Sequence, residues 1–369
     1  MGPGPCNPYP EAAAALSRPM LGHLDPEFIA VLDQTCERLR TVFRTDNPMT
    51  LPLSGTGSAG MEAAFVNLVT PGDPVVIGVN GLFGERMCDV AARCGAEVVR
   101  VDVPWGRPID PDELVAAHPA PTIIALVHAE TSTGARSDIA AVGAAKGDAL
   151  LLVDCVTSLG GIDVDIDAWA VDVAYAGTQK CLGVPPGLAP LTLSERARER
   201  LVGRSASWYL DLRMIGRYTG PAAAAADPRV YHHTAPVSMI YSLHAGLGAL
   251  LEEGLDAAIA RHTACGRMLQ AGLEQRGLRL FAAEGHRLPE LTTVWIPDGV
   301  DDAKVRATLR ERYGIEIGPG AGQLAGTAWR IGCMGHTARP RNVRLLLAAL
   351  DEVLDEQRGP ARGEVLGGG

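Results

Sequence analysis

The chain has 369 residues, 47% of them apolar, and a formal net charge of −10. This length predicts two domains, and the acidic balance argues against a nucleic-acid partner. No apolar run reaches the ~20 residues that span a bilayer, and the N-terminus lacks the basic and apolar regions of a secretory signal, so we expect no membrane association.

The first two hundred residues alternate between short apolar runs and helical patterns. Runs rich in Val and Ile without polar alternation are typical of strands buried on both faces. Such runs span residues 74–80, 96–103, 122–130, 149–155 and 171–177. Helical patterns lie between them, as in GERMCDVAARCG (84–95) and IAAVGAAKGD (139–148). The alternation predicts an α/β fold with a mostly parallel sheet between layers of helices.

From about residue 240 the pattern changes to two long helices separated by Gly254, followed by short strands and further helices. This pattern is typical of a small α+β domain. We therefore predict four parts, which are an N-terminal extended segment (1–16), a large domain (17–253), a small C-terminal domain (254–358) and a disordered tail (359–369).

A glycine-rich stretch, GTGSAG (55–60), matches the GxGxxG pattern of dinucleotide-binding loops. The match is weak because the preceding TLPL (50–53) contains Pro52 and is a poor strand. A loop of Gly, Ser and Thr before a helix also presents free N–H groups to an anion, and Thr56 and Ser58 add hydroxyls. An anion-binding cup and an ordinary capped helix are both open at this point.

Polar residues follow two of the predicted strands. Asp154 lies at the end of ALLLVDC (149–155), and HAETSTG (128–134) ends another run. In open α/β sheets, ligands bind at the carboxyl ends of the strands. Asp154 could there bind a metal, a ribose hydroxyl or a protonated ring nitrogen, although taken alone it is more typical of a cap for the next helix.

Lys180 is one of only three lysines beside thirty arginines. Lys146 and Lys304 lie in polar helical stretches, where we expect solvated amines. Lys180 instead follows a buried run and precedes the turn LGVPPG (182–187), where burial would lower the pKa of an amine and free it for Schiff-base chemistry. An anion cup, Asp154 and Lys180 match the phosphate, the pyridine nitrogen and the aldehyde of pyridoxal 5'-phosphate.

The eight cysteines are scattered and form no CxxC pair. This spacing argues against a zinc site or a thioredoxin-like redox site. Scattered thiols are typical of the reducing cytoplasm. We therefore expect a cytoplasmic protein without a metal site.

Several stretches in a fixed order resemble the class V, fold-type I aminotransferases of the alanine–, serine– and ureidoglycine–glyoxylate group. They are GHLDPEF (22–28), NGLFGER (80–86), HAETSTG, VDCVTSLGG (153–161), GTQK (177–180), YHHT (231–234) and WRIGCMG (329–335). The resemblance covers nearly the whole chain. It implies a large domain with a mostly parallel seven-stranded sheet sandwiched by helices, and a small C-terminal α+β domain.

The resemblance also implies an activity and a partner. The activity is pyridoxal-phosphate-dependent, ping-pong transamination from a small amino acid such as alanine, serine or ureidoglycine to glyoxylate, which gives glycine and a 2-oxo acid. The implied partner is a second copy of the chain, in a homodimer with shared active sites.

The resemblance implies a role for each matching residue. Lys180 is the catalytic lysine, Arg330 binds the substrate carboxylate, and Gly4 lies in the wall of the substrate pocket. The implied cofactor-binding residues are Thr56, Gly57, Ser58, Phe83, Thr131, Asp154, Val156, Gln179, Tyr231 and Thr234. Of these, Tyr231 and Thr234 would come from the neighbouring subunit. Phe83 replaces the Trp of many relatives, and Ser58 replaces the His of some.

Three alternatives stay open at this point. Other class V chemistry includes 2-aminoethylphosphonate transamination and cysteine desulfuration or lyase chemistry. Cys333 is the one candidate nucleophile for desulfuration, although no flexible Ser/Gly-rich cysteine loop surrounds it. A nicotinamide-dependent oxidoreductase built on GTGSAG is the alternative from a different class of enzyme.

Overall fold

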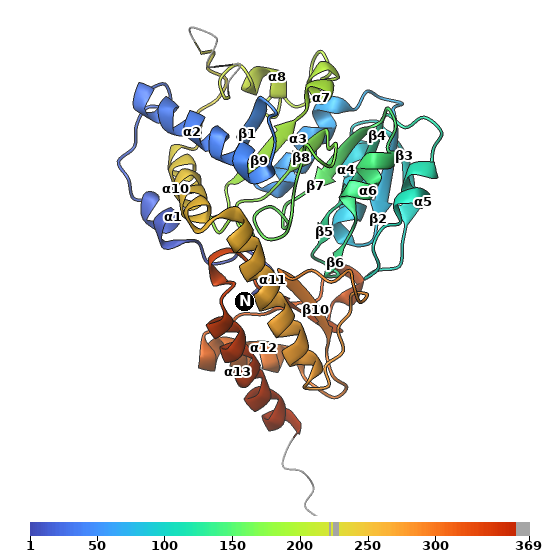
Figure 1. Cartoon of the computed structure of the whole chain (residues 1–369), viewed down its shortest axis with the longest axis vertical. Coiled ribbons are helices and arrows are strands. Elements are labelled where there is room, and N and C mark those ends of the chain that lie inside the picture. Colours follow the sequence, from blue (N-terminus) through green and yellow to red (C-terminus); the bar gives the residue numbers. More distant parts are fainter. Residues whose placement is uncertain (221–222, 224–228, 359–369) are drawn as a thin grey trace, which may run out of the picture.

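The computed structural model describes residues 1–220, 223 and 229–358. The predicted disordered tail, 359–369, lies outside the described residues. Figure 1 shows a large sheet with flanking helices in the upper part of the molecule and a small sheet with the last helices in the lower part. None of the helices in these ranges combines the length and the apolar character needed to cross a bilayer.

The large sheet has seven strands in the order β1-β9-β8-β7-β4-β2-β3. The strands are β1 (Met49–Ser54), β2 (Pro74–Val79), β3 (Glu97–Asp102), β4 (Ile123–Val127), β7 (Leu150–Asp154), β8 (Val173–Tyr175) and β9 (Leu188–Leu193). Five of them, β2, β3, β4, β7 and β8, are mutually parallel, and β9 is antiparallel to both of its neighbours. The predicted α/β fold with a mostly parallel seven-stranded sheet is confirmed.

Alternate residues of the central strands enter two separate apolar layers. In β4, Ile124 and Leu126 face one layer, while Ile123, Ala125 and Val127 face the other. The first layer is covered by α1 (Pro10–Ala15), α2 (Pro26–Phe43), α5 (Pro111–Ala116), α6 (Ile139–Ala145) and α10 (Val237–Glu253). The second is covered by α3 (Gly57–Leu68), α4 (Leu82–Arg93), α7 (Glu195–Glu199) and α8 (Leu212–Ile215). Burial on both faces explains why these strands lack polar alternation.

The sheet corrects our view of residues 50–53 as a poor strand. They belong to β1, an edge strand in which Pro52 lies opposite Pro190 of β9. An edge position tolerates proline because one side of the strand needs no hydrogen-bond donor. The strand that follows α3 is β2, which β9, β8, β7 and β4 separate from β1 in the sheet, so the loop after β1 does not join two adjacent parallel strands as a dinucleotide-binding loop does.

Two further expectations differ from the structure. In the segment 1–16, predicted to be extended, Pro10–Ala15 form α1, since proline at the first helical position and four successive alanines favour a helix. The run 122–130 contains not one strand but two. After β4 ends at Val127, β5 (Ala129–Glu130) pairs with β6 (Ala135–Arg136) in a separate two-stranded ribbon.

Lys146 is also not solvated, as we had expected. Its amine is buried and forms an ion pair with Asp172, which is buried as well. Asp172 additionally accepts from the N–H of Leu151 and the hydroxyl of Ser194. The polar sequence around Lys146 gives no sign of this carboxylate, which lies 26 residues further along the chain. Lys304 is exposed, as expected.

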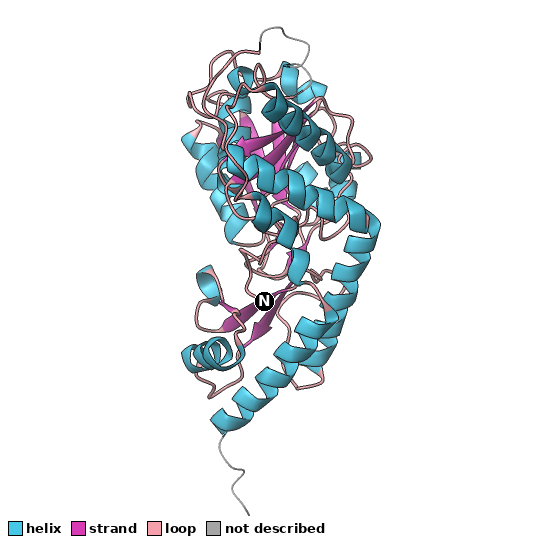
Figure 2. Cartoon of the chain, turned by 90° about the vertical axis from the view of Figure 1, so that its left-hand side faces the viewer, coloured by secondary structure: helices cyan, strands magenta, loops and turns pink. Residues whose placement is uncertain are grey.

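The lower part of the molecule is built on a small antiparallel sheet in the order β10-β12-β11. Its elements are α11 (Leu255–Glu274), β10 (Leu291–Trp295), α12 (Asp302–Tyr313), β11 (Gly318–Pro319), the 3₁₀ turns Gly322–Leu324 and Gly335–Thr337, β12 (Ala328–Gly332) and α13 (Pro340–Arg358). These elements, seen from the side in Figure 2, enclose an apolar cluster of their own, with Trp329 and Leu309 among its members. Gly254 separates α10 from α11, whereas the proposed domain boundary at residues 253 and 254 stays a prediction.

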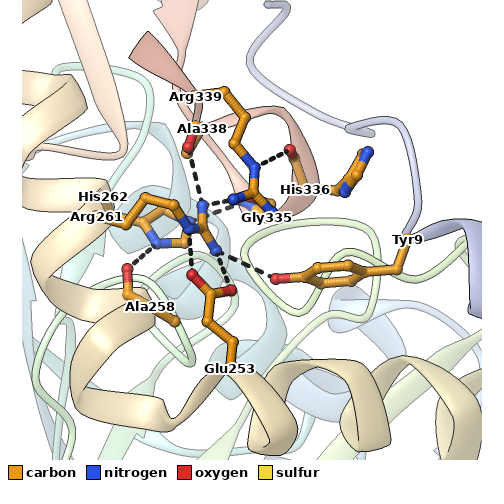
Figure 3. A network of polar contacts seen from close by, with 9 residues as sticks. All are labelled: Tyr9, Glu253, Ala258, Arg261, His262, Gly335, His336, Ala338 and Arg339. Atoms are coloured by element: carbon orange, nitrogen blue, oxygen red, sulfur yellow. Dashed lines mark hydrogen bonds and ion pairs between the residues drawn. The ribbon is translucent and has the colours of Figure 1, made fainter.

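Arg261 joins three distant segments near this junction (Figure 3). Its guanidinium pairs with Glu253 and donates to the hydroxyl of Tyr9. It also donates to the carbonyl oxygens of Gly335 and Ala338, both at 2.9 Å. The N-terminal segment, the junction of α10 with α11 and the loop after β12 are therefore held together by one side chain.

Candidate active site

A cavity of about 250 Å³ lies at the carboxyl ends of β4 and β7, beside the first turns of α3 and α4. Nine of the predicted site residues line it: Thr56, Gly57, Ser58, Phe83, Thr131, Asp154, Val156, Gln179 and Lys180. Strand ends bring these segments together because neighbouring parallel strands end at the same edge of the sheet. Met61, Arg86, Val127, Ala129 and Thr157 complete the lining and were not predicted.

Lys180 lies in the turn that follows β8, under the N-terminal segment. Its Nζ donates to the carbonyl oxygen of Pro3 at 2.5 Å. A Cβ added to Gly4, which has a φ of +105°, would lie 2.5 Å from that same Nζ. Burial, together with the nearby positive charge of Arg330, lowers the pKa of the Lys180 amine. The amine is therefore more easily neutral than a solvated lysine.

Asp154 is the last residue of β7 and is only 4% exposed. One carboxylate oxygen, Oδ1, accepts from the N–H of Val156 at 2.8 Å. Burial raises the pKa of this carboxyl to about 6, and the hydrogen bond from Val156 opposes that shift. No cationic side chain within the described ranges forms an ion pair with it. A protonated ring nitrogen in the cavity would hold the carboxylate ionised.

The first turn of α3 forms the anion-binding side of the cavity. Thr56 is the N-cap residue, but its side chain makes no capping hydrogen bond, and the N–H groups of Gly57 and Ser58 have no acceptor within the helix. The amide oxygen of Gln179 is buried without a hydrogen-bond partner. The N–H groups of Gly57 and Ser58 and the positive end of the helix dipole can hold a phosphate group, to which the NH₂ of the Gln179 amide can also donate.

Arg330, on β12, is not among the residues that line the cavity, but it contacts one of them, Thr131. Its Nε donates to the carbonyl oxygen of Pro319 at 2.9 Å, and its Nη1 donates to that of Thr131 at 3.4 Å. The guanidinium has no carboxylate partner among the ion pairs of the described residues. It therefore keeps donors free for a carboxylate that enters the cavity.

Comparisons with known proteins identify the family. Residues 6–334 match the family Aminotransferase class-V. The chain belongs to the class-V aminotransferases. It is 38% identical to the (S)-ureidoglycine–glyoxylate transaminase of Bacillus subtilis, over 96% of this chain and 90% of that protein. It is also 38% identical to an alanine–glyoxylate aminotransferase of Drosophila melanogaster, over 97% of this chain and 92% of that protein.

A solved structure extends this similarity to three dimensions. The alanine–glyoxylate aminotransferase from Nostoc sp. is 46% identical and superimposes with a TM-score of 0.91, over 96% of this chain and 94% of that chain. The resemblance predicted from the sequence motifs is thereby confirmed. The names of these relatives do not favour the aminoethylphosphonate and desulfurase alternatives.

Tyr231 and Thr234 of this class-V aminotransferase are not brought to the cavity of their own chain. The hydroxyl of Tyr231 lies 3.2 Å from that of Thr234, and the Tyr231 ring lies 4.8 Å from the ring of His23. Tyr231 is 49% exposed. Donation of these two residues to a neighbouring subunit stays a prediction.

Cys333 is a poor nucleophile in this aminotransferase. It is fully buried beside the small sheet, and burial raises the pKa of its thiol to about 12. A desulfurase needs a mobile, readily ionised cysteine, and Cys333 is neither. This side chain therefore belongs to the apolar cluster of the small sheet.

Arg86 is the most informative residue that sequence reasoning missed. It lies on the cavity wall, donates to the hydroxyl of Ser58 at 3.2 Å, and has its guanidinium carbon 5.0 Å from the centre of the Phe83 ring. Its position three residues after Phe83 in the same helix could have revealed it, because such residues share a helix face. It adds a positive charge beside the anion cup.

A wider cleft, of about 350 Å³, lies between the start of β1 and the helices α7 and α8. Its lining includes Arg198, Arg213 and Arg217, together with Glu195 and Glu199. None of the predicted site residues lines it. The smaller cavity, which gathers the amine, the carboxylate and the helix start, is therefore the candidate active site.

Proposed function

We propose that this aminotransferase uses pyridoxal 5'-phosphate to transfer the amino group of a small amino acid to glyoxylate, giving glycine and a 2-oxo acid by a ping-pong mechanism. The observation that carries the proposal is one cavity that contains a desolvated lysine amine, a buried carboxylate and the start of a helix. Glyoxylate as acceptor is supported by the names of relatives at 38% and 46% identity.

The residues of the cavity fit each part of the cofactor. Lys180 would bind its aldehyde carbon, and Asp154 its pyridine nitrogen. Thr56, Gly57, Ser58 and Gln179 would hold its phosphate, with Phe83 and Val156 on the two faces of its ring and Thr131 at its edge. When bound, the cofactor withdraws electrons from the α-carbon of the amino acid and so makes the proton on that carbon acidic.

The side chains around it perform the remaining tasks. The neutral Nζ of Lys180 accepts the proton from the α-carbon, for which its lowered pKa prepares it. Arg330 binds the α-carboxylate with two parallel N–H groups and so orients the α-carbon. Gly4, which has no side chain to crowd the Lys180 amine, would form a short wall of the substrate pocket, which suits an acid as small as glyoxylate.

A cytoplasmic homodimer is part of the proposal. The exposed Tyr231 and its neighbour Thr234 support a site completed by a second copy of the chain. All eight cysteines are unpaired, as is usual in a reducing compartment. A protein that is fully active as a monomer in light scattering would contradict the shared site.

The test is glycine formation from glyoxylate with a panel of amino donors that includes alanine, serine and ureidoglycine. Lys180→Ala should abolish turnover, together with the visible absorbance band that borohydride removes from a lysine-bound cofactor. Lys304→Ala changes an exposed lysine and should leave both unchanged. Normal turnover by Lys180→Ala, or no glycine from any donor, would overturn the proposal.

A further inference from the structure

Glu130 is a fully buried carboxylate in β5, just behind the cavity wall. It accepts four hydrogen bonds. Its Oε2 accepts from the N–H groups of Phe83 at 3.1 Å and Gly84 at 3.4 Å. Its Oε1 accepts from the N–H of Ser132 at 3.0 Å and from the Ser132 hydroxyl at 2.6 Å.

These bonds replace the missing cap of α4. The N-cap residue of α4, Gly81, has no side chain to cap the helix, and a Cβ at this position would collide with the Glu130 carboxyl group. The hydroxyl of Ser132 accepts from the N–H of Leu82 at 3.0 Å. The first three N–H groups of α4 are thus all satisfied by side chains from residues 130–132.

The two ends of this arrangement lie in the candidate active site. The first turn of α4 carries Phe83, which lines the cavity. Thr131 lies between the two capping residues and lines the cavity as well, while its carbonyl oxygen accepts from Arg330. Glu130 therefore contacts the backbone of Phe83 on one side. On the other side it contacts the backbone of Ser132, which follows Thr131, the residue that Arg330 contacts.

The negative charge of an ionised Glu130 strengthens the four hydrogen bonds that this carboxylate accepts. Hydrogen bonds to an ionised carboxylate are about twice as strong as those between neutral groups. Burial raises the pKa of Glu130 to about 7, and the two hydrogen bonds from Ser132 act against that rise. Asp154 adds a second negative charge nearby, whereas Glu130 and the Arg330 guanidinium attract each other.

We infer that Glu130 is a positioning residue, which fixes the first turn of α4 and the backbone of Thr131 and so sets the ring-stacking Phe83 relative to the carboxylate-binding Arg330. The roles of Phe83 and Arg330 in this inference rest on the proposed function. The capping itself does not, since all of its hydrogen bonds lie within the protein.

The first test is Glu130→Gln in the full-length protein. Glutamine keeps the shape, but its NH₂ group faces two donors that then lose their acceptor. In protein without cofactor, amide hydrogen exchange at Phe83 and Gly84 should become about tenfold faster or more. With cofactor, the dissociation constant for pyridoxal phosphate should rise about tenfold, and the visible circular dichroism of the bound cofactor should weaken. The KM for the amino donor should also rise.

Two further variants control the result. Ser132→Ala removes the acceptor for Leu82 and one donor to Glu130, and should shift the same readouts less and in the same direction. It also provides the decision if Glu130→Gln does not fold. Glu97→Gln changes an exposed carboxylate at the start of β3 and should match the unaltered protein.

The outcomes separate this inference from the proposed function. Unchanged exchange at Phe83 and Gly84 together with unchanged dichroism in Glu130→Gln would overturn the positioning role. If the unaltered protein binds no pyridoxal phosphate, the proposed function fails, and the exchange rates of the cofactor-free protein still decide whether Glu130 holds α4.

Discussion

The buried pair of Lys146 and Asp172 permits a quantitative prediction about stability. Their side chains are 5% and 4% exposed. The Asp172 carboxylate also accepts from the N–H of Leu151 at 3.0 Å and the hydroxyl of Ser194 at 2.9 Å. It therefore joins the start of β7, whose far end carries Asp154, to the residue that caps α7.

Asp172→Asn keeps the shape of the side chain but leaves a buried ammonium without a counter-charge. Removing one partner of a buried ion pair costs about 3–5 kcal/mol, because the remaining charge stays out of water. Native proteins are stable by about 5–15 kcal/mol, so the loss should be a large fraction of the total. The double variant with Lys146→Met removes both charges, while the amide oxygen of the new asparagine can still accept from Leu151. It should lose less stability than Asp172→Asn alone.

The measurement is equilibrium unfolding in urea at one fixed protein concentration, followed by circular dichroism. Asp148→Asn changes an exposed carboxylate and serves as the control, with an expected change within about 0.5 kcal/mol. The reasoning is refuted if Asp172→Asn costs less than about 1 kcal/mol, or if the double variant is the less stable of the two.

Three predictions concern the active site. Arg86→Met should weaken binding of pyridoxal phosphate about tenfold but leave binding of unphosphorylated pyridoxal unchanged, as measured by absorbance titration. Equal losses of affinity for both ligands would argue against a phosphate contact. The control is Arg93→Met, on the exposed side of α4. Gly4→Ala should lower kcat about 100-fold with little change in melting temperature, because the new methyl group displaces the Lys180 amine. An unchanged kcat would contradict this, because it would mean that the N-terminal segment moves away and leaves the amine in place. The rate of transamination should rise with pH as Lys180 loses its proton. Arg330→Gln should move this rise to higher pH, since the charge of Arg330 lowers the pKa of Lys180. A shift of the pH–rate profile to lower pH would contradict this effect of the Arg330 charge.

The residues that could be found from sequence are those whose signals are local. Asp154 and Lys180 each follow a buried apolar run, so their place at the ligand-binding edge follows from the rule for parallel strands. The helix start at 56–58 follows from its composition of small and hydroxylic residues. Family resemblance supplied Arg330, for which the one local signal is its position in the apolar stretch AWRIGCMG (328–335).

Features that depend on pairing across the fold could not be found in this way. Pro52 suggests a non-strand segment, and only the position of β1 at the edge of the sheet, with Pro52 opposite Pro190 of β9, makes it compatible with a strand. The buried state of Lys146 depends on Asp172. The capping of α4 by Glu130 joins residues 47 positions apart, and neither stretch taken alone indicates this contact.

The guanidinium of Arg261 has a consequence for motion. Glu253 precedes Gly254 and Arg261 follows it, so any change of angle between α10 and α11 strains their ion pair. The same guanidinium contacts the loop that follows the strand of Arg330. It also contacts the hydroxyl of Tyr9, and the N–H of Tyr9 donates to the turn after Lys180. Rotation of the lower sheet against the upper one would therefore have to break these bonds, and the lysine and the arginine that handle the substrate keep their spacing for as long as the bonds hold.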